Sequence, residues 1–150
     1  MQRKFRAGIV RRAGNVVMAT TARLGVGPGY LQLLTVTGRK SGERRTTPVQ
    51  LVIEGQRRWL VAPYGEVQWV KNARAAGRVT LSRGRHSTDY TIEQITGTEA
   101  GRILKRYVKM APVVVPYFEA GLTSSAEEFA AEAETHPVFV LSPVAEGRGG

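Results

Sequence analysis

The order of helical and strand-like segments is the feature that most constrains the fold of this chain of 150 residues. Short runs rich in Leu, Val, Ile and Thr are bounded by turns that contain Gly or Pro, and several of them follow one another without a helix between them. The predicted order is helix, three strands, helix, two strands, two helices and a last strand. A parallel sheet needs a crossover helix between successive strands, so this order predicts mainly antiparallel pairing.

The predicted elements suit a small antiparallel barrel with flanking helices, an α+β fold that forms one domain over residues 1–150. The six predicted strands are Leu31–Thr37, Val49–Ile53, Arg58–Ala62, Val79–Ser82, His86–Ile95 and Val138–Ser142. Helices are expected over residues 1–28, over Val67–Ala76, over Glu99–Met110 with Thr98 as cap, and from a capping box of Ser124 and Glu127 to about Ala133. The proline-containing segment Ala111–Gly121 is predicted to be irregular, and residues 145–150 to form a loose tail.

Charge is unevenly placed along the chain, whose formal net charge is +10. Residues 1–90 carry 17 Lys and Arg against 4 Asp and Glu, a balance of +13, whereas residues 91–150 carry 5 against 8, a balance of −3. The basic part favours an anionic partner, which charge alone leaves open: nucleic acid, anionic lipid, or a small phosphorylated and carboxylated ligand.

Composition excludes several kinds of chemistry. The sequence has no cysteine, so disulfides and thiolate catalysis are absent, and its two histidines, His86 and His136, lack a carboxylate at metal-ligand spacing. No protein-bound metal is therefore expected. No apolar run approaches the ~20 residues of a membrane span, and Val16–Ala19 is too short for a secretory signal, which favours a cytoplasmic protein.

The N-terminal segment is strongly basic, because residues 1–42 contain eight Lys or Arg and no acid. One loosely apolar helical face combines Phe5, Ile9, Ala13, Val16 and Thr20. Such a helix could contact anionic lipid as a peripheral membrane anchor, or pack on the barrel with its arginines in water. The shortness of the apolar face favours packing.

The segment Thr37–Pro48, TGRKSGERRTTP, is the most distinctive motif, with four basic side chains between two predicted strands. Its two glycines allow successive backbone amides to point at one anion. Arg39 and Arg45 can each hold a phosphate or carboxylate through two parallel hydrogen bonds, and Lys40 adds a compact charge. The spacing matches neither the ATP-binding P-loop nor the dinucleotide fingerprint. From the residues alone, a polyanion-binding loop and a solvated basic hairpin both remain open.

Longer stretches resemble a known family. The runs LLTVTGRKSGERRTTPVQLV, WLVAPYG, WVKNARAAGRV and VFVLSPV are similar to those of the deazaflavin-dependent nitroreductase family, whose members use coenzyme F-420 on a split β-barrel. The resemblance covers about Leu31–Val144, and TGRKSG-x-x-R-x-x-P is its most specific part. It implies an oxidoreductase that transfers hydride from reduced coenzyme F-420 to a quinone, a nitroaromatic or an activated double bond. It is also compatible with a homodimer.

The resemblance also implies a cofactor site. In the family, the positions that match the basic loop surround the phosphate and oligoglutamate tail of the coenzyme, the position of Asn72 lies near the cofactor, and Pro48 and Val49 lead into the strand beneath the ring. For Trp69, packing in the core is an equally good interpretation. The implied cofactor-binding residues are Arg39, Lys40, Ser41, Gly42, Arg45, Thr46, Pro48, Val49, Ala62, Pro63, Tyr64, Trp69 and Asn72.

Two departures from the family pattern concern the ring and the substrate. Where many relatives have a Ser-Lys pair followed by glycines, this chain has Ala62-Pro63-Tyr64-Gly65, so a lysine contact is missing and Tyr64 is expected to replace it. Where relatives offer several tyrosines over the substrate, Met110–Phe118 has one tyrosine and three valines. This composition predicts a lipophilic acceptor, unless the valines simply pack on the barrel.

Hydrogen-bond donors are expected to help catalysis because negative charge develops on the acceptor as hydride arrives. Tyr64 and Tyr117 are the predicted catalytic residues, and His86 is a weaker candidate that a structural role explains better. The predicted substrate pocket comprises Met110, Val113, Tyr117 and Phe118.

Three other functions fit the sequence less well. An FMN-dependent oxidoreductase on the same barrel would leave the basic loop with more cations than the FMN phosphate needs. A non-catalytic carrier of the cofactor or of a fatty acid has no feature that favours it. A nucleic-acid binder would be expected to show a recognition motif or a row of exposed aromatic residues, and neither is present, so no nucleic-acid partner is predicted.

Overall fold

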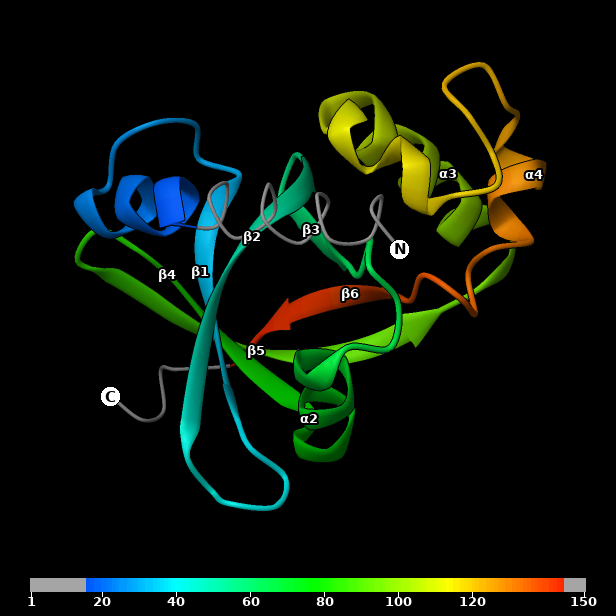
Figure 1. The fold of residues 1–150 in the computed structure, drawn as a ribbon. Coiled ribbons are helices and arrows are strands. Elements are labelled where there is room, and N and C mark those ends of the chain that lie inside the picture. Colours follow the sequence, from blue (N-terminus) through cyan, green and yellow to red (C-terminus); the bar gives the residue numbers. More distant parts are fainter. Residues whose placement is uncertain (1–15, 145–150) are drawn as a thin grey trace, which may run out of the picture.

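The computed structural model describes residues 16–144. Six strands form a closed barrel in the order β1-β2-β3-β6-β5-β4, and all of these pairings are antiparallel (Figure 1). The strands are β1 (Leu31–Thr37), β2 (Arg44–Glu54), β3 (Arg57–Val61), β4 (Arg78–Arg83), β5 (His86–Ile95) and β6 (Val138–Pro143). The predicted antiparallel barrel of about six strands is confirmed.

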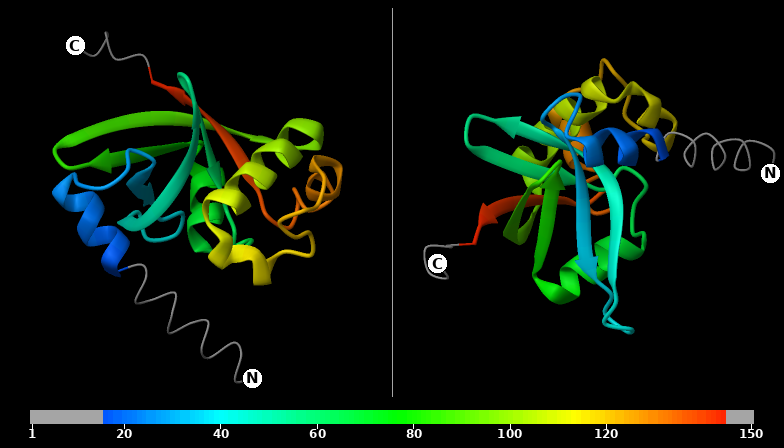
Figure 2. Two further views of the ribbon diagram at one scale, coloured as in Figure 1. Left: turned by 90° about the horizontal axis from the view of Figure 1, so that it is seen from above. Right: turned by 90° about the vertical axis from the view of Figure 1, so that its left-hand side faces the viewer.

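Helices cover the barrel at different places. They are α2 (Gln68–Ala76), α3 (Gly97–Met110), the 3₁₀ helix η1 (Pro112–Tyr117) and α4 (Ala126–Ala130). The helix α2 packs on β1 and β4 beside the β1–β2 loop. The helix α3 packs on β2, β3 and β6, and both η1 and α4 pack against α3. Figure 2 shows α3 and the helical segment 16–24 on the same side of the barrel.

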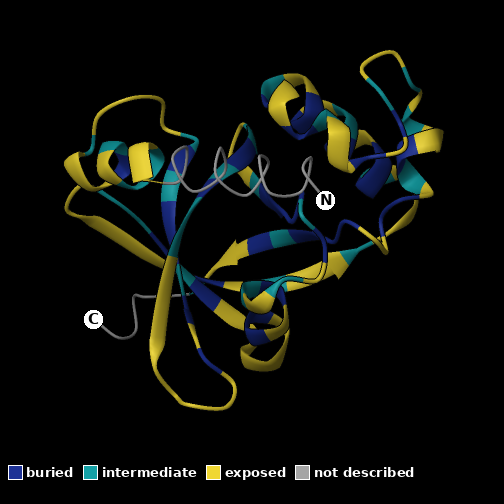
Figure 3. Cartoon of the chain, viewed as in Figure 1, coloured by how far each residue is buried: buried dark blue, intermediate teal, exposed yellow. Residues whose placement is uncertain are grey.

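The core consists of two layers separated by β3, whose side chains alternate between the two faces of the sheet. Leu60 points into the barrel and packs with Leu34, Leu51 and Phe139, while Trp59 points outward beneath α3. Figure 3 shows buried residues alternating with more exposed ones along the strands and helices. The Trp59 indole Nε1 donates to the Glu99 carboxylate at 3.1 Å, which fixes the start of α3 over the barrel.

The strand β2 begins five residues earlier than predicted, at Arg44 instead of Val49. Thr37 pairs with Arg44 and Thr35 with Thr46, and the Thr35 and Thr46 hydroxyls lie 2.9 Å apart across the two strands. Arg44, Arg45 and Thr46 are all exposed, so the start of β2 lacks the apolar alternation that identifies a strand. The loop proper is therefore only 38–43.

The predicted helix starts need correction. Thr96 occupies the N-cap position of α3, so Thr98 lies inside the helix. The capping box is formed by Ser125 and Glu128, one residue later than predicted, and the Ser124 hydroxyl instead accepts from the Gly121 amide at 2.8 Å. The helix α4 ends at Ala130, and not at about Ala133.

The segment predicted to be irregular contains a short helix. Residues Pro112–Tyr117 form η1, with a proline at its start, where the fixed φ suits a helix and the missing N–H leaves no bond unmade. Nearby, α3 and α4 approach each other closely at Gly101. A Cβ there would lie 2.1 Å from the carbonyl oxygen of Ala126, so only glycine fits.

The N-terminal segment is helical over residues 16–24 and not as far as residue 28. It packs through Met18, Ala19 and Ala22 against β1, whereas Val16 and Thr20, predicted on the packing face, are exposed. The helix thus packs on the strand through one methionine and two alanines. Phe5, Ile9 and Ala13 of the predicted face lie outside the described residues, as does the predicted tail 145–150. None of the helices in the described part of the chain has the length and apolarity of a membrane span.

Candidate functional site

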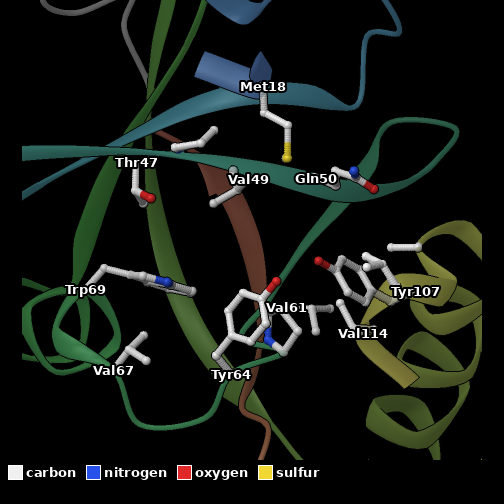
Figure 4. A pocket seen from close by; sticks show the side chains of 14 residues that line it. Met18, Thr47, Val49, Gln50, Val61, Tyr64, Val67, Trp69, Tyr107 and Val114 are labelled. Atoms are coloured by element: carbon white, nitrogen blue, oxygen red, sulfur yellow. The ribbon is translucent and has the colours of Figure 1, made fainter. Parts of the chain in front are cut away.

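A cavity of about 240 Å³ lies between β2, the segment that follows β3, the start of α2, and the α3–η1 unit (Figure 4). We call it the central cavity. Most of its lining is apolar, with a few hydroxyl and amide groups among the apolar side chains, as in many small-molecule sites. It is lined by Met18, Thr47, Pro48, Val49, Gln50, Val61, Pro63, Tyr64, Val67, Trp69, Tyr107, Ala111, Val113 and Val114.

The central cavity has two ends that differ in the elements that form them. Val67 and Trp69 from the start of α2 line one end, and Tyr107 and Val114 line the other, the α3 end (Figure 4). Tyr64 lies between the two ends, and its hydroxyl points into the open space. Since β2 runs along both, its successive residues contribute to each end.

Two polar groups of the α3 end are buried. Among residues 16–144, the Gln50 side-chain oxygen Oε1 is one of the few buried polar atoms without a hydrogen-bond partner. Tyr107 extends from the buried face of α3, and its hydroxyl points into the central cavity (Figure 4). Burial, together with the nearby Tyr64, raises the pKa of Tyr107 well above its usual range, so the hydroxyl keeps its proton.

A second depression of about 300 Å³ lies between the β1–β2 loop and α2. Its lining is strongly basic, and we call it the basic groove. The side chains of Lys40 and Arg45 are exposed there, and Arg45 Nη2 lies 3.4 Å from the Glu43 carboxylate in an exposed ion pair. It is lined by Gly38, Arg39, Lys40, Ser41, Arg45, Gln68 and Asn72.

The helix α2 holds the basic loop in place. The buried Asn72 side chain accepts two hydrogen bonds through Oδ1, from the Arg39 backbone amide at 3.0 Å and from Arg39 Nη1 at 2.7 Å. Gln68 Oε1 accepts a third from Arg39 Nη1 at 3.0 Å. Asn72 was expected near the ligand; the structure shows that its oxygen is engaged by Arg39, so its position orders the loop.

The loop itself depends on two glycines. Gly42 has φ of +74°, a conformation that other residues rarely adopt. A Cβ at Gly38 would lie 2.9 Å from the Ser41 hydroxyl and 3.3 Å from the Glu43 carbonyl oxygen. The loop therefore folds tightly, and the amides of Gly38, Arg39, Gly42 and Glu43 are hydrogen-bonded within the protein. Its cationic side chains lie close together, which suits a polyanionic group.

The start of α2 lies between the two depressions and contributes residues to both. Val67 and Trp69 face the central cavity, while Gln68 and Asn72 face the basic groove. The helix lies wholly within the described residues, and it has neither an acid in its first turn nor a side-chain cap at Val67. Its partial positive charge therefore adds to the field at the junction.

The structure brings most predicted site residues together. Those on the central cavity are Pro48, Val49, Pro63, Tyr64, Trp69 and Val113, and those on the basic groove are Arg39, Lys40, Ser41, Arg45 and Asn72. Trp69 lines the cavity, and its ring also packs on the barrel core, with its centroid 6.3 Å from that of Phe139. Gly42 shapes the loop, Thr46 is an exposed residue of β2, and Ala62 is buried in the barrel core.

Other predicted residues lie away from the central cavity. Tyr117 packs edge-on against Tyr64, with ring centroids 4.8 Å apart, but it lines a separate depression with His136. Phe118 is buried and stacks on His136 at 3.9 Å. Met110 lines a third depression, and the exposed His86 starts β5 at the β4–β5 turn. Tyr117 can therefore act on the cavity only through Tyr64.

Sequence reasoning missed several cavity residues. Gln50 is a polar residue among the apolar residues of a strand, which is a signal, although a weak one. Tyr107 shares the apolar face of α3 with Leu104 and Val108, so its helical spacing indicates only core packing. Met18 has no local signal for a site, whereas Val114 belongs to the valine run from which an apolar pocket was predicted. In the described part of the chain, no three His, Asp or Glu side chains form a group that could hold a metal ion.

Comparison with solved structures identifies similar folds. A structure described as an F420-H2 dependent reductase (FDR-A) is 25% identical, with a TM-score of 0.55 over 76% of this chain and 95% of that one. A structure described as a domain-swapped dimer is 22% identical, with a TM-score of 0.58 over 90% and 98%. A putative pyridoxamine 5'-phosphate oxidase from Listeria innocua is 11% identical, with a TM-score of 0.54 over 77% and 85%, and shares the fold alone.

The family comparison covers most of the chain. No curated protein matches it significantly. The model of the family described as F420H(2)-dependent quinone reductase matches residues 5–120, which include the barrel up to β5, the basic loop, α2, α3 and η1. The chain therefore belongs to the F420H(2)-dependent quinone reductase family, and it is a split-barrel oxidoreductase that depends on coenzyme F-420.

Proposed function

We propose that this protein reduces a lipophilic quinone with coenzyme F-420, whose anionic tail lies in the basic groove and whose ring lies at the α2 end of the central cavity. One observation carries the proposal. The first turn of α2 contributes Gln68 to the basic groove and Val67 and Trp69 to the central cavity, so a single elongated ligand can occupy both. A ligand with an anionic tail and a planar apolar head has this distribution of chemistry.

The basic loop is the proposed tail site. Arg39 is already oriented by Asn72 and Gln68, so little conformational freedom is lost when it binds an anion. Lys40 and Arg45 supply further positive charge from exposed side chains, and bidentate contacts from arginine suit both phosphate and carboxylate. Ser41 also lines the groove. An oligoglutamate tail with a phosphate engages these cations more fully than the single phosphate of FMN does.

The α2 end of the central cavity is the proposed ring site. Pro48 and Val49 provide the apolar surface of β2, and Trp69 provides an aromatic one from α2. Pro63 and Tyr64 take the place of the Ser-Lys pair expected from the family pattern. Tyr64 is held by the edge-on ring of Tyr117, so these two predicted catalytic residues act as a donor and its support.

The α3 end is the proposed acceptor site. When bound, the reduced deazaflavin supplies a hydride. The chain contributes by placing the acceptor beside the ring and by excluding water with the apolar residues Val113, Val114 and Ala111. Val113 is 67% exposed although it lines the cavity, so it stands at the opening, where an apolar molecule would enter. These features support a lipophilic acceptor such as a quinone.

Ligand titration tests the proposal. We expect coenzyme F-420 to bind more tightly than FMN and than a deazaflavin without its tail, and we expect a naphthoquinone to oxidise the reduced coenzyme when the protein is present under anaerobic conditions. Tighter binding of FMN would favour an FMN-dependent oxidoreductase. Tight binding of coenzyme F-420 without oxidation by any quinone would favour a carrier.

We also propose a homodimer with peripheral membrane contact. One structural neighbour is described as a domain-swapped dimer, which supports the first part. Val16, Val17 and Leu24 are exposed apolar residues of the N-terminal helix, which supports the second. Light scattering should give twice the chain mass, and sedimentation with anionic vesicles should deplete the protein. A monomer, or a protein that stays in the supernatant, would contradict the respective part.

A further inference from the structure

We propose that Tyr107 and Gln50 form the polar part of the acceptor site. The Tyr107 hydroxyl donates a hydrogen bond to a carbonyl oxygen of the acceptor. The Gln50 carboxamide oxygen accepts a hydrogen bond from the hydroxyl group that this carbonyl becomes on reduction. The pair would select acceptors in which a carbonyl becomes a hydroxyl. This inference rests on the proposed quinone reduction. It assigns acceptor-binding roles to two residues that the sequence patterns do not single out.

The position of the pair is the first argument. Gln50 and Tyr107 reach the α3 end of the central cavity from opposite walls, one from β2 and the other from α3 (Figure 4). Their neighbours in the described lining of this end are the apolar residues Met18, Ala111, Val113 and Val114. A polar atom of a ligand bound here would find hydrogen-bonding partners in these two side chains, with the Tyr64 hydroxyl at the border of this end.

The protonation of Tyr107 is the second argument. The side chain is almost entirely buried, and its hydroxyl points into the cavity (Figure 4). Because burial disfavours the phenolate and Tyr64 disfavours it further, the pKa of Tyr107 is raised and the group stays neutral. It is therefore a hydrogen-bond donor to the ligand, and not a source of the proton that the reduction consumes.

The unsatisfied oxygen of Gln50 is the third argument. Its Oε1 atom is buried without a hydrogen-bond partner among the described residues. Buried polar groups are rarely left unpaired, and an exception often marks the place of a ligand atom. A hydroxyl group of the reduced acceptor is the donor that this oxygen needs. The pair thus contains a hydrogen-bond donor that suits the quinone and a hydrogen-bond acceptor that suits the hydroquinone.

The reaction balances without a net proton from either residue. With the reduced coenzyme bound, hydride transfer would convert the quinone to the hydroquinone anion, which would take one proton from water. The coenzyme would lose one hydride and return one proton to water, so it would end oxidised and the protons would balance. Tyr107 keeps its proton throughout, while Gln50 changes its partner from none to the new hydroxyl group.

Binding measurements with the protein free of coenzyme test the pair. The probes are 2-methyl-1,4-naphthoquinone and 2-methylnaphthalene, which has the same rings without the two carbonyl oxygens, and Trp69 at the cavity wall reports binding by its fluorescence. We expect Tyr107→Phe to weaken quinone binding about five- to tenfold, the effect of one buried hydrogen bond, and to leave the hydrocarbon within about twofold. Tyr30→Phe, in another depression, is the matched control and should change neither.

A spectroscopic measurement separates a hydrogen bond from a change of shape. The infrared carbonyl stretch of the bound quinone should move to higher frequency in Tyr107→Phe, since a carbonyl that loses a donor regains double-bond character. Equal weakening of quinone and hydrocarbon, or an unshifted carbonyl band, would overturn the role of Tyr107. Because no coenzyme is present, either result is independent of whether coenzyme F-420 binds.

A second variant keeps the proposal testable if Tyr107→Phe fails to fold. Gln50→Leu replaces the carboxamide by an apolar group of similar size. We expect it to weaken binding of the hydroquinone about fivefold while quinone binding changes by less than about twofold. Hydroquinone affinity equal to that of the original protein would exclude the role of Gln50.

Discussion

Replacement of Asn72 by alanine tests whether α2 prepares the basic loop for its ligand. Asn72 Oδ1 accepts one hydrogen bond from the Arg39 amide at 3.0 Å and one from the Arg39 guanidinium at 2.7 Å. The hydrogen bond from the neutral amide contributes about 1 kcal/mol. A hydrogen bond from a charged group contributes about 1.5–3 kcal/mol when it is buried, but the solvent exposure of Arg39 reduces this contribution to about 1 kcal/mol. Asn72→Ala thus removes about 2 kcal/mol of loop organisation.

The expected result is a loss of affinity for the tail and not for the ring. In the variant, part of the binding free energy of coenzyme F-420 must be used to order the loop. A cost of about 2 kcal/mol corresponds to about 30-fold weaker binding of the coenzyme. A deazaflavin without its tail does not touch the basic groove, so its affinity should change by less than about twofold. Fluorescence titration of both ligands on each protein gives the two ratios, and circular dichroism shows whether the barrel is intact.

The matched control is Gln94→Ala. Gln94 Oε1 also accepts two hydrogen bonds from an arginine of α2, at 3.2 Å and 3.0 Å from Arg74, but it lies on β5 and lines neither the basic groove nor the central cavity. Both ligands should bind this variant as they bind the original protein. Unchanged coenzyme affinity in Asn72→Ala, or equal losses for the coenzyme and its tail-less form, would refute the idea that α2 orders the tail site.

Two predictions concern stability. Gly101→Ala should lower the free energy of unfolding in urea by about 3 kcal/mol, because the new Cβ would lie 2.1 Å from the carbonyl oxygen of Ala126. Gly121→Ala is the control, since a Cβ there meets open space, and it should change the free energy by less than about 0.5 kcal/mol. Equal effects of the two substitutions would contradict this account. The hydrogen bond and charge of Arg74 lower the pKa of Glu66 from its ordinary value of 4.5. The ionised carboxylate therefore stabilises the fold at pH values above 4.5, and this stabilisation is lost as the pH falls through the lowered pKa. Glu66→Gln should thus cost less than about 1 kcal/mol at pH 7, and its melting temperature should converge with that of the original protein near pH 3; a constant difference would exclude this ion pair as the cause.

The fold could be predicted where local pattern and turn chemistry agree. The strands Leu31–Thr37 and His86–Ile95 match the structure at both ends, and the turns at Gly55 and Gly84 join their strands as expected. The start of β2 could not be predicted, because Arg44–Thr47 owes its strand conformation to pairing with β1 and not to apolar alternation. The capping box shifted by one residue because Ser124 and Ser125 are adjacent and each has an acid three residues later.

The two parts of the candidate site differ in how far the sequence reveals them. The basic groove is largely continuous in the chain, so charge and glycine spacing pointed to it directly. The α3 end of the central cavity combines residues from distant elements, Met18, Gln50, Tyr107 and Val114. They come together because α3 packs against β2 and because the N-terminal helix packs against β1. The same limit explains why Phe118 was expected in the pocket, although it stacks on His136 in the core.

The position of α2 gives a physical reason for the two parts to act together. Its first turn separates the basic groove from the central cavity, and it anchors Arg39 through Asn72 while it presents Trp69 to the cavity. A ligand that binds only one part would gain either the charge contacts or the apolar contacts. A ligand that spans α2 gains the charge contacts and the apolar contacts while it loses its translational freedom only once. Its affinity therefore exceeds the affinity of a ligand that binds the basic groove or the central cavity alone. The tail can therefore position the ring opposite Tyr107 and Gln50 without any contact between the tail and the acceptor.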